Sequence, residues 1–533
     1  MTANPPRATN LIDLRNRVRE NALGHASEPP GFFSLTVPTG GGKTLTSLAF
    51  ALAHAAAHRR RRIIFVIPYL SIIEQNVDVI RRALGDPGGT TGIVLEHHSN
   101  VVDEPHEDET TGADGQGGAA LRRRLLAENW DAPVVVTTTV QFFETLFSNR
   151  PKNVRRLHNI AQSVVVFDEA QTFPPEMLRP MMGMLKQLAE EPYRTSFVFC
   201  TATQPALTVE VGQNTGTPFR LLEPETVREL AAEPAELFRM LKRVRVDWSG
   251  ALIPATPEGV AERMVAAGSA LAIVNTKQQA RELFAALRAR DSQAFHLSTR
   301  MCPVHRRDVL DAIRARLKAR KPCLVASSQL VEAGVDLDFP AVWRAMGPLD
   351  SIAQAAGRCN REDSLGGLGQ VTVFGTWDGK LPPGVYMQAT RVTEAMLKSR
   401  HGKINIHDPA TFRTYFETLD NSVRLDKSSV QSARQGLDFP KVAADFKIID
   451  TETTPVLVPF REGKRFIEQL DADPEGLRTD PAFVQRIGRF TVGLYEGELK
   501  KATVDLHQSG VRIFRGTYDD ALGLVLPGDY SEA

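Results

Sequence analysis

Short, almost wholly apolar runs alternate along the chain with longer segments in which apolar residues recur every three or four positions. Runs such as GFFSLTVP at 31–38, RRIIFVIP at 61–68 and SVVVFDEA at 163–170 are typical of strands buried on both faces. The longer segments are typical of amphipathic helices. Buried strands that alternate with helices predict a parallel sheet built from βαβ units, so the predicted fold class is α/β.

The same alternation begins again near residue 243, with the apolar runs SALAIVNT at 269–276 and KPCLVASS at 321–328. After residue 440 the pattern changes to short strands, such as TPVLVPF at 454–460, among many turn residues. Two α/β domains in tandem followed by a small C-terminal accessory domain are therefore predicted. The expected segments are an N-terminal helical extension at 1–30, α/β domains at 31–235 and 236–385, a helical linker at 386–440 and the accessory domain at 441–533.

Two segments of the first half have distinct patterns. Near the N-terminus, Leu11, Leu14, Val18 and Leu23 fall near one face of a predicted amphipathic helix. Residues 101–120 are acidic, rich in glycine and without periodicity, so we expect a solvated, mobile loop there.

Composition narrows the class of protein only slightly. Hydrophobic residues make up 42% and charged residues 24%, which is ordinary for a soluble globular protein. The net charge of +1 implies that any nucleic-acid site must be a local patch. The four cysteines show no metal-binding spacing and are expected to be reduced thiols. We see neither an apolar run of the roughly 18 residues that a membrane span needs nor a signal peptide, so we expect a cytoplasmic protein.

The stretch LTVPTGGGKTLTSLAF at 35–50 combines a strand, a glycine loop, a Lys-Thr pair and a helix. This is the context of a phosphate-binding loop, in which glycines turn backbone N–H groups inward and the helix N-terminus favours an anion. Lys43 can pair with the β- and γ-phosphates, and Thr44 can offer a hydroxyl to Mg²⁺. The strict pattern would require glycine where the chain has Val37. The predicted loop consists of Thr39, Gly40, Gly41, Gly42, Lys43 and Thr44.

The run VVVFDEAQ supplies carboxylates at the end of a predicted strand. Asp168 is placed to hold the shell of a Mg²⁺ ion, and Glu169 can orient or deprotonate the attacking water. Gln171 can both donate and accept a hydrogen bond, so it suits contact with a neighbouring motif.

A third motif, QAAGRCNR, lies in the second α/β domain. We expect it to open a helix, with Gln354, Arg358 and Arg361 near one face. Guanidinium groups clamp a phosphate well because they are planar, permanently charged forks. Arginines supplied from a second domain would make hydrolysis depend on domain closure.

Polar residues cluster where several predicted strands end, in PYLSIIEQ, TTTVQFFETLF and TATQ of the first domain. IVNTKQQA and ASSQLVEAGVDLDF follow strands in the second domain. Open α/β sheets bind ligands at the carboxyl ends of their strands, and Thr, Ser and Asn suit contact with a nucleic-acid backbone. Two domains that close on ATP around one strand could move along it.

In order along the chain, these motifs resemble those of superfamily 2 helicases. LRNRVRENAL, PYLSIIEQN, VLEHHSN and RFTVGLY resemble more narrowly the helicase part of the CRISPR-associated helicase–nuclease of type I systems. The resemblance covers residues 11–400 strongly and the tail weakly. It implies two tandem RecA-like domains, ATP and Mg²⁺ as cofactors, and 3′-to-5′ translocation on single-stranded DNA. It also implies recruitment by the Cascade surveillance complex to the R-loop that Cascade forms.

The resemblance also implies roles for individual residues. Thr39 to Thr44 would hold the ATP phosphates, and Asp168 would bind Mg²⁺ together with Thr44. Asp336 would contact the ribose, Glu169 would direct water, and the arginine motif would sense the γ-phosphate. The residues implied to lie along the DNA strand are Thr137, Thr138, Gln141, Asn275 and Ser327.

Two features of this family are missing from the motif set. No HD nuclease pattern precedes residue 30, and the pair His407-Asp408 has no accompanying metal-ligand cluster in sequence. We therefore expect that this chain does not cut DNA by itself, and that an HD nuclease is a separate chain or domain. No clear glutamine motif for adenine precedes the phosphate loop. His97 and His98 are expected to make polar contacts rather than bind a metal.

Two other functions remain open at the level of sequence. One is an RNA helicase of the same superfamily, which stimulation by RNA instead of DNA would reveal. The other is a recruitment scaffold with an inactive motor, although Lys43, Asp168 and Glu169 are all present.

Overall fold

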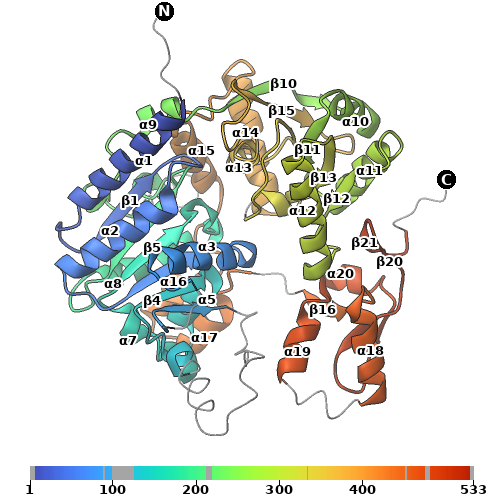
Figure 1. Cartoon of the computed structure of the whole chain (residues 1–533). Helices are drawn as coiled ribbons and strands as arrows, with labels where there is room; N and C mark the ends of the chain where they lie inside the picture. Colours follow the sequence, from blue (N-terminus) through green and yellow to red (C-terminus); the bar gives the residue numbers. More distant parts are fainter. Residues whose placement is uncertain are drawn as a thin grey trace, which may run out of the picture. The chain divides into compact units, whose positions relative to one another are not determined.

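The structure, a computed structural model, describes residues 7–87, 91–98, 125–211, 219–332, 334–449, 453–473 and 481–528. The predicted loop at 101–120 lies outside these residues. The chain divides into two compact units (Figure 1). Unit 1 comprises Met1–Lys242 and Ile404–Ile448, and unit 2 comprises Arg243–Lys403 and Ile449–Ala533. The chain thus returns to unit 1 within the segment predicted as a linker.

Unit 1 is built around a parallel sheet with the strand order β3-β4-β2-β5-β6-β1-β9. The strands β1, β2, β4 and β6 are buried along their whole length, and β5 is buried except at Asp168, as expected from their apolar runs. The strands in sheet order are β3 (Val94–His97), β4 (Val134–Thr138), β2 (Ile63–Ile67), β5 (Val164–Asp168), β6 (Ser196–Thr201), β1 (Phe32–Thr36) and β9 (Val227–Glu229).

Helices cover this sheet, and the amphipathic first helix packs on the second (Figure 1). In that first helix Leu14 and Val18 are buried as expected. Leu23 was expected on the same face but is 38% exposed, and Ala22 is buried in its place. The main helices of unit 1 are α1 (Arg7–Gly24), α2 (Lys43–Ala57), α3 (Leu70–Ala83), α5 (Thr139–Phe147), α6 (Pro151–Val154), α7 (Leu157–Ile160), α8 (Leu178–Ala189) and α9 (Pro234–Met240).

The returning segment of unit 1 is helical and is anchored by aromatic and polar contacts. Phe446 stacks on Phe147 of α5 with ring centroids 3.8 Å apart. Arg434 donates hydrogen bonds to Gln187 and to the Gly183 carbonyl of α8. Its helices are α15 (Pro409–Ser422), α16 (Val430–Gln435) and α17 (Phe439–Asp445). His407-Asp408 is a helix start, in which the Asp408 side chain caps α15.

Unit 2 contains a second parallel sheet, with the strand order β10-β15-β14-β11-β13-β12. Its strands in that order are β10 (Val244–Pro254), β15 (Gly369–Gly375), β14 (Ala341–Ala345), β11 (Ser269–Ile273), β13 (Cys323–Ser327) and β12 (Phe295–Leu297). The accompanying helices are α10 (Pro257–Ala266), α11 (Lys277–Arg288), α12 (Pro303–Lys318), α13 (Leu349–Ala356) and α14 (Val385–Ser399). The predicted fold class, two RecA-like sheet domains and an accessory domain, is confirmed.

The C-terminal part of unit 2 forms a small mixed sheet that packs against the start of α12. Cys302 belongs to one of its two apolar clusters, and Val304 packs against both. The strands are β17 (Thr491–Leu494), β16 (Thr454–Leu457), β19 (Arg512–Phe514) and β18 (Val504–Leu506), with a hairpin of β20 (Tyr518–Asp519) and β21 (Gly523–Leu524). The helices are α18 (Glu462–Ala472), α19 (Pro481–Gly488) and α20 (Glu496–Leu499).

Candidate nucleotide-binding site and strand-end motifs

The predicted phosphate loop connects β1 to α2, and its glycines are required by geometry. Gly40 and Gly42 have φ angles of 83° and 89°, which side chains with a Cβ rarely adopt. A Cβ on Gly41 would lie 2.4 Å from a methyl carbon of Val37. With valine at position 37, this loop conformation therefore requires glycine at position 41. The loop ends at Gly42, and α2 begins at Lys43.

Two residues that the sequence analysis missed hold this loop in place. The Arg15 guanidinium of α1 donates two hydrogen bonds to the Gly40 carbonyl, at 2.9 and 2.7 Å. The half-buried Glu229 carboxylate of β9 accepts hydrogen bonds from Ser34 and Thr36 of β1, the strand that leads into the loop. Arg15 lies within the segment LRNRVRENAL, but the contact of neither residue can be read from its own segment, because each acts on a segment distant in the chain.

The loop lysine is paired with the DEAQ motif. Lys43 Nζ lies 3.0 Å from Glu169 Oε1. Burial alone would lower the pKa of Lys43, but the charges of Glu169 and Asp168 outweigh burial, so its pKa is raised. Lys43 therefore stays a cation, as a phosphate ligand requires.

Asp168 lies at the end of β5 next to this pair, and its surroundings suit a bound cation. Burial and the neighbouring Glu169 charge raise the pKa of Asp168 to about 6, although Lys43 opposes the shift. Two adjacent carboxylates thus share one lysine, which leaves negative charge for Mg²⁺ to balance. Asp168 and the Thr44 hydroxyl remain the predicted ligands of a Mg²⁺ ion, whose other ligands would be phosphate and water.

A chain of side-chain hydrogen bonds continues from this pair to the TATQ motif. Gln171 Nε2 donates to Glu169 Oε2 at 2.6 Å, and Thr201 Oγ1 donates to Gln171 Oε1. Thr201 Oγ1 accepts in turn from the backbone N–H of Thr203 at 2.9 Å. The expected contact between Gln171 and a neighbouring motif is confirmed. A change at the phosphate end can therefore reach the end of β6 through direct contacts.

The QAAGRCNR motif of unit 2 closes a helix, so the prediction that it opens one is wrong. Helix α13 starts after Pro348, and Gly357 ends it, which leaves both arginines beyond the last turn. Arg358 is 8% exposed and donates to the Val331 and Glu332 carbonyls.

The other three predicted residues of this motif region are more accessible. Arg361 lies 3.3 Å from the exposed carboxylate of Asp336, and its backbone N–H donates to Asp338. Gln354 lies on α13 and is half-buried. Arg361 is thus available for a ligand, whereas Arg358 braces the loop that precedes Asp336.

In unit 1, the polar residues predicted along a DNA strand are mostly used within the protein. Thr137 is buried and its hydroxyl donates to the His97 carbonyl. The Thr138 hydroxyl accepts from the Gln141 N–H and caps α5. The Gln141 side chain, in contrast, lines an open cavity of about 390 Å³. The basic residues of that cavity are Arg150, Lys152, Arg155 and Arg156.

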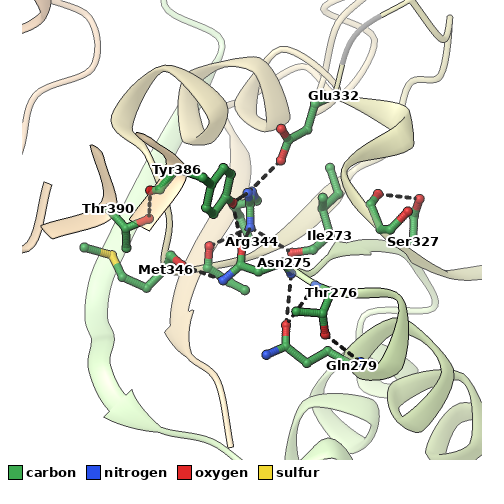
Figure 2. Close-up of polar contacts among 12 residues, drawn as sticks. Ile273, Asn275, Thr276, Gln279, Ser327, Glu332, Arg344, Met346, Tyr386 and Thr390 are labelled. Carbon is green, nitrogen blue, oxygen red and sulfur yellow. Dashed lines mark hydrogen bonds and ion pairs between the residues drawn. The ribbon is translucent and has the colours of Figure 1, made fainter. Parts of the chain in front are cut away.

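In unit 2, Asn275 belongs to a buried network centred on Arg344 (Figure 2). Arg344 is paired with Glu332 at 2.7 Å and donates to Asn275 Oδ1 and the Tyr386 hydroxyl, each at 2.8 Å. Asn275 Nδ2 donates to the Met346 carbonyl. The Glu332 charge outweighs burial and raises the pKa of Arg344. The network ties the loops after β11, β13 and β14 to α14.

Ser327 is also enclosed. It is fully buried, and its hydroxyl donates to the carbonyls of Leu297 and Ser328. The side chains of Thr137, Asn275 and Ser327 therefore shape the strand ends from inside.

The histidine and cysteine residues show no metal site within the described ranges. His97 contacts Arg156 and the Trp130 ring, and His98 contacts Glu96. All four cysteines are buried thiols. In the part of the chain that the structure describes, no group of three or more His, Cys, Asp or Glu side chains is arranged to hold a metal ion. Within the same ranges, no helix is long and apolar enough to cross a membrane.

Comparison with known families agrees with the fold and the motif chemistry. A family model described as "DEAD/DEAH box helicase" matches residues 20–211, which include the phosphate loop, DEAQ and TATQ. A second model, described as "CRISPR-associated nuclease/helicase Cas3, C-terminal", matches residues 266–364. The two sheets and the linked motifs are similar to those of a DExD/H-type helicase core. Within that class, the chain is similar to the helicase part of Cas3.

Individual curated relatives show the same similarity. The chain is 29% identical over 464 residues to a CRISPR-associated nuclease/helicase Cas3 of Haloferax volcanii, a match covering 68% of this chain and 49% of that protein. A Cas3 of Methanothermobacter thermautotrophicus is 23% identical over 429 residues, covering 76% and 48%. The chain thus spans about half the length of these curated relatives. The T. fusca Cas3–ADP crystal structure matches with a TM-score of 0.67 at 17% identity, over 98% of this chain and 72% of that one.

Proposed function

We propose that this chain is an ATP-driven helicase motor that translocates 3′ to 5′ on single-stranded DNA and unwinds target DNA in type I CRISPR interference. The observation that carries the proposal is the continuous chain of contacts from Lys43 through Glu169 and Gln171 to Thr201. These contacts connect the phosphate loop to the TATQ motif at the end of β6. A nucleic-acid motor needs such a connection between its ATP site and the residues that contact the nucleic acid.

In the proposed reaction, the loop from Thr39 to Thr44 binds the ATP phosphates and Lys43 neutralises their charge. Mg²⁺, held by Asp168 and Thr44, would withdraw charge from the β- and γ-phosphates. Glu169 orients the attacking water once ATP has drawn Lys43 away from its present pairing. The ion pair between Lys43 and Glu169 is therefore proposed to exist only without nucleotide, because the phosphates of ATP replace Glu169 as the partner of Lys43.

Unit 2 is proposed to contribute to the same reaction. Arg361 is assigned to the γ-phosphate and Asp336 to the ribose, so that nucleotide replaces their present ion pair. Gln354 is assigned to the phosphate with Arg361. Arg358 is assigned a positioning role, because its guanidinium is held by two backbone carbonyls.

We propose that single-stranded DNA contacts the loops at the carboxyl ends of the β-strands. The contacts are made chiefly by backbone groups and half-exposed side chains of the protein. Gln141 and the basic residues of its cavity suit phosphates, which bind without sequence information. Four residues affect DNA binding only by holding these loops in position: Thr137, Thr138, Asn275 and Ser327. Mutation of these four residues would therefore change the stimulation of ATP turnover by DNA, because the loops would move.

The proposed partners follow from the relatives. One similar solved chain belongs to a "CRISPR RNA-guided surveillance complex, pre-nicking", with a TM-score of 0.58. We accordingly propose recruitment by Cascade to an R-loop. DNA cleavage is assigned to an HD nuclease on a separate chain or domain.

The test is ATP turnover with and without single-stranded DNA. Wild-type chain should hydrolyse ATP faster with DNA, and Lys43→Ala or Asp168→Asn should abolish turnover while the heat-unfolding midpoint stays near wild type. Asp13→Asn, at an exposed position of α1, is the matched control and should behave as wild type. Stimulation by RNA but not DNA would favour an RNA helicase, and no turnover in any condition would favour a scaffold.

A further inference from the structure

A second cavity lies in unit 2, away from the motif loops. It has a volume of about 1050 Å³ and is bounded by α11, α12, β12 and the C-terminal segments around residues 459–464 and 517–521. Phe295 lines it at the amino end of β12, whereas the motif residues follow the carboxyl ends of β11 and β13. The cavity runs along α12 from His305 to Arg316, and neither Asn275 nor Ser327 lines it.

His296, which lines this cavity, has one ring nitrogen without a hydrogen-bond partner among the described residues. His296 is 4% exposed and burial lowers its pKa to about 4, so the ring is neutral near pH 7. The ring makes a backbone hydrogen bond to Ala280. Within the described part of the chain, no group forms a hydrogen bond with His296 Nδ1. A buried polar atom without a partner costs about 1–3 kcal/mol, which a ligand N–H group would recover.

Around this acceptor the walls are aromatic. Phe284, Phe295, Phe460 and Tyr518 line the cavity. His305 is stacked on Phe460, with centroids 4.4 Å apart and an interplanar angle of 16°. Flat, rigid walls of this kind favour a flat ring over a flexible aliphatic chain.

The rim is basic. Four cations, Arg288, Arg316, Arg461 and Lys464, line the cavity, against the two carboxylates of Asp308 and Asp520. Arg461 is paired with Asp308 at 2.8 Å, so that carboxylate is already balanced. Lys464 lies on the exposed side of α18, where its ammonium can approach an anion.

From these three features we propose that the cavity binds nucleotide units, with a base in the aromatic interior and its phosphate at the basic rim. A nucleobase carries N–H donors on a flat ring, and the attached phosphate supplies the anion, so one ligand satisfies all three features. The volume is slightly above the roughly 300–1,000 Å³ typical of pockets for one small ligand, which suits two consecutive nucleotides. The bound nucleotide can be a free nucleotide or part of single-stranded DNA.

The first experiment is calorimetric titration of the full chain with the 5′-phosphorylated deoxydinucleotide pdApdA, with the phosphate loop saturated by ADP and Mg²⁺. Lys464→Glu should weaken binding about tenfold, because a favourable phosphate contact becomes repulsive. Arg465→Glu is the matched control, since Arg465 is the next residue on α18, is exposed and does not line the cavity. Absence of binding by wild type, or equal losses in the two variants, would overturn the proposal.

A second variant tests the interior. His296→Phe keeps a ring but removes the acceptor, so it should weaken pdApdA binding without changing its salt dependence. Lys464→Glu should instead reduce the logarithmic salt slope by about 0.7 per lost phosphate contact on a single strand. If both variants bind pdApdA like wild type, the assignment is wrong, whatever the folding of His296→Phe.

A third comparison distinguishes a free nucleotide from single-stranded DNA as the ligand of the cavity. It also tests the cavity independently of the proposed motor function. If the cavity serves a strand, a twelve-nucleotide oligodeoxyadenylate should bind more tightly than pdApdA and lose more affinity in Lys464→Glu. Equal affinities would assign the cavity to free nucleotides. The inference does not rest on ATP hydrolysis, so Lys43→Ala should bind pdApdA as wild type does, even if the proposed motor activity is absent.

Discussion

At the scale of single residues, the phosphate loop depends on a contact that spans 25 positions of sequence. Two hydrogen bonds from Arg15 hold the Gly40 carbonyl, and the Arg15 side chain also packs over Gly42, where an added Cβ would lie 3.3 Å from its Cγ. By holding the carbonyl from the α1 side, Arg15 limits the conformations of the loop before nucleotide arrives.

Replacing Arg15 should therefore weaken nucleotide binding through loop order. We expect Arg15→Ala to raise the dissociation constant of ADP–Mg²⁺ about three- to tenfold, since hydrogen bonds from a charged group contribute about 1.5–3 kcal/mol and are partly solvated here. Calorimetric titration of the purified chain measures this. Arg17→Ala, on the exposed side of the same helix, is the control. An unchanged constant in Arg15→Ala would show that the loop is ordered without it.

At the scale of secondary-structure elements, helix α15 in the returning segment contains a buried carboxyl group. Asp420 is 2% exposed, next to the buried Leu419. Burial raises the pKa of Asp420 to about 7 from 3.8. The folded chain therefore holds a proton that the unfolded chain has already lost between these pH values. The free energy of unfolding must fall as pH rises through this window.

Removing this carboxylate should stabilise the fold only where the carboxylate is charged. We expect Asp420→Asn to raise the stability of unit 1 by about 1–3 kcal/mol at pH 8 and by little at pH 4. Calorimetric unfolding midpoints at both pH values give the comparison, and Glu417→Gln on the exposed side of α15 is the control. A gain of equal size at pH 4 would contradict the charge argument.

At the scale of the whole molecule, ATP turnover is proposed to need residues of both units. Arg361 of unit 2 has an accessible guanidinium whose present partner is Asp336. If it meets the γ-phosphate during hydrolysis, its contribution grows as charge develops in the transition state. Arg361→Ala should then lower the turnover number by about 10³-fold or more and change ATP affinity much less.

Single-turnover hydrolysis and ATP binding, measured on the same Arg361→Ala sample, separate the two effects. Arg307→Ala, at an exposed position of α12, serves as the arginine control. If Arg361→Ala weakens ATP binding but leaves the turnover number unchanged, Arg361 contacts ATP in the ground state and does not stabilise the transition state.

Much of the fold was accessible from the sequence because it depends on local pattern. The helix predicted at the Lys-Thr pair is α2, which ends at Ala57, and the strand within GFFSLTVP is β1. The error at QAAGRCNR arose because the i, i+4 spacing of its polar residues suits a helix, while Gly357 ends the helix before the arginines. Leu23 was misplaced for a similar reason, since helical spacing alone does not define where the partner surface stops.

The sequence by itself determined the two parallel sheets, the phosphate loop and the DEAQ carboxylates, because each depends on neighbouring residues and on strand or helix periodicity. Only the tertiary structure decided that Arg15 and Glu229 brace the loop, and that Asn275 and Ser327 are enclosed by other side chains. It also decided that the chain returns to unit 1 after α14 and that the accessory domain completes a nucleotide-sized cavity with α12. The physical reason is that these features are contacts between segments far apart in sequence, and a single chain's residue pattern does not specify which distant surfaces meet.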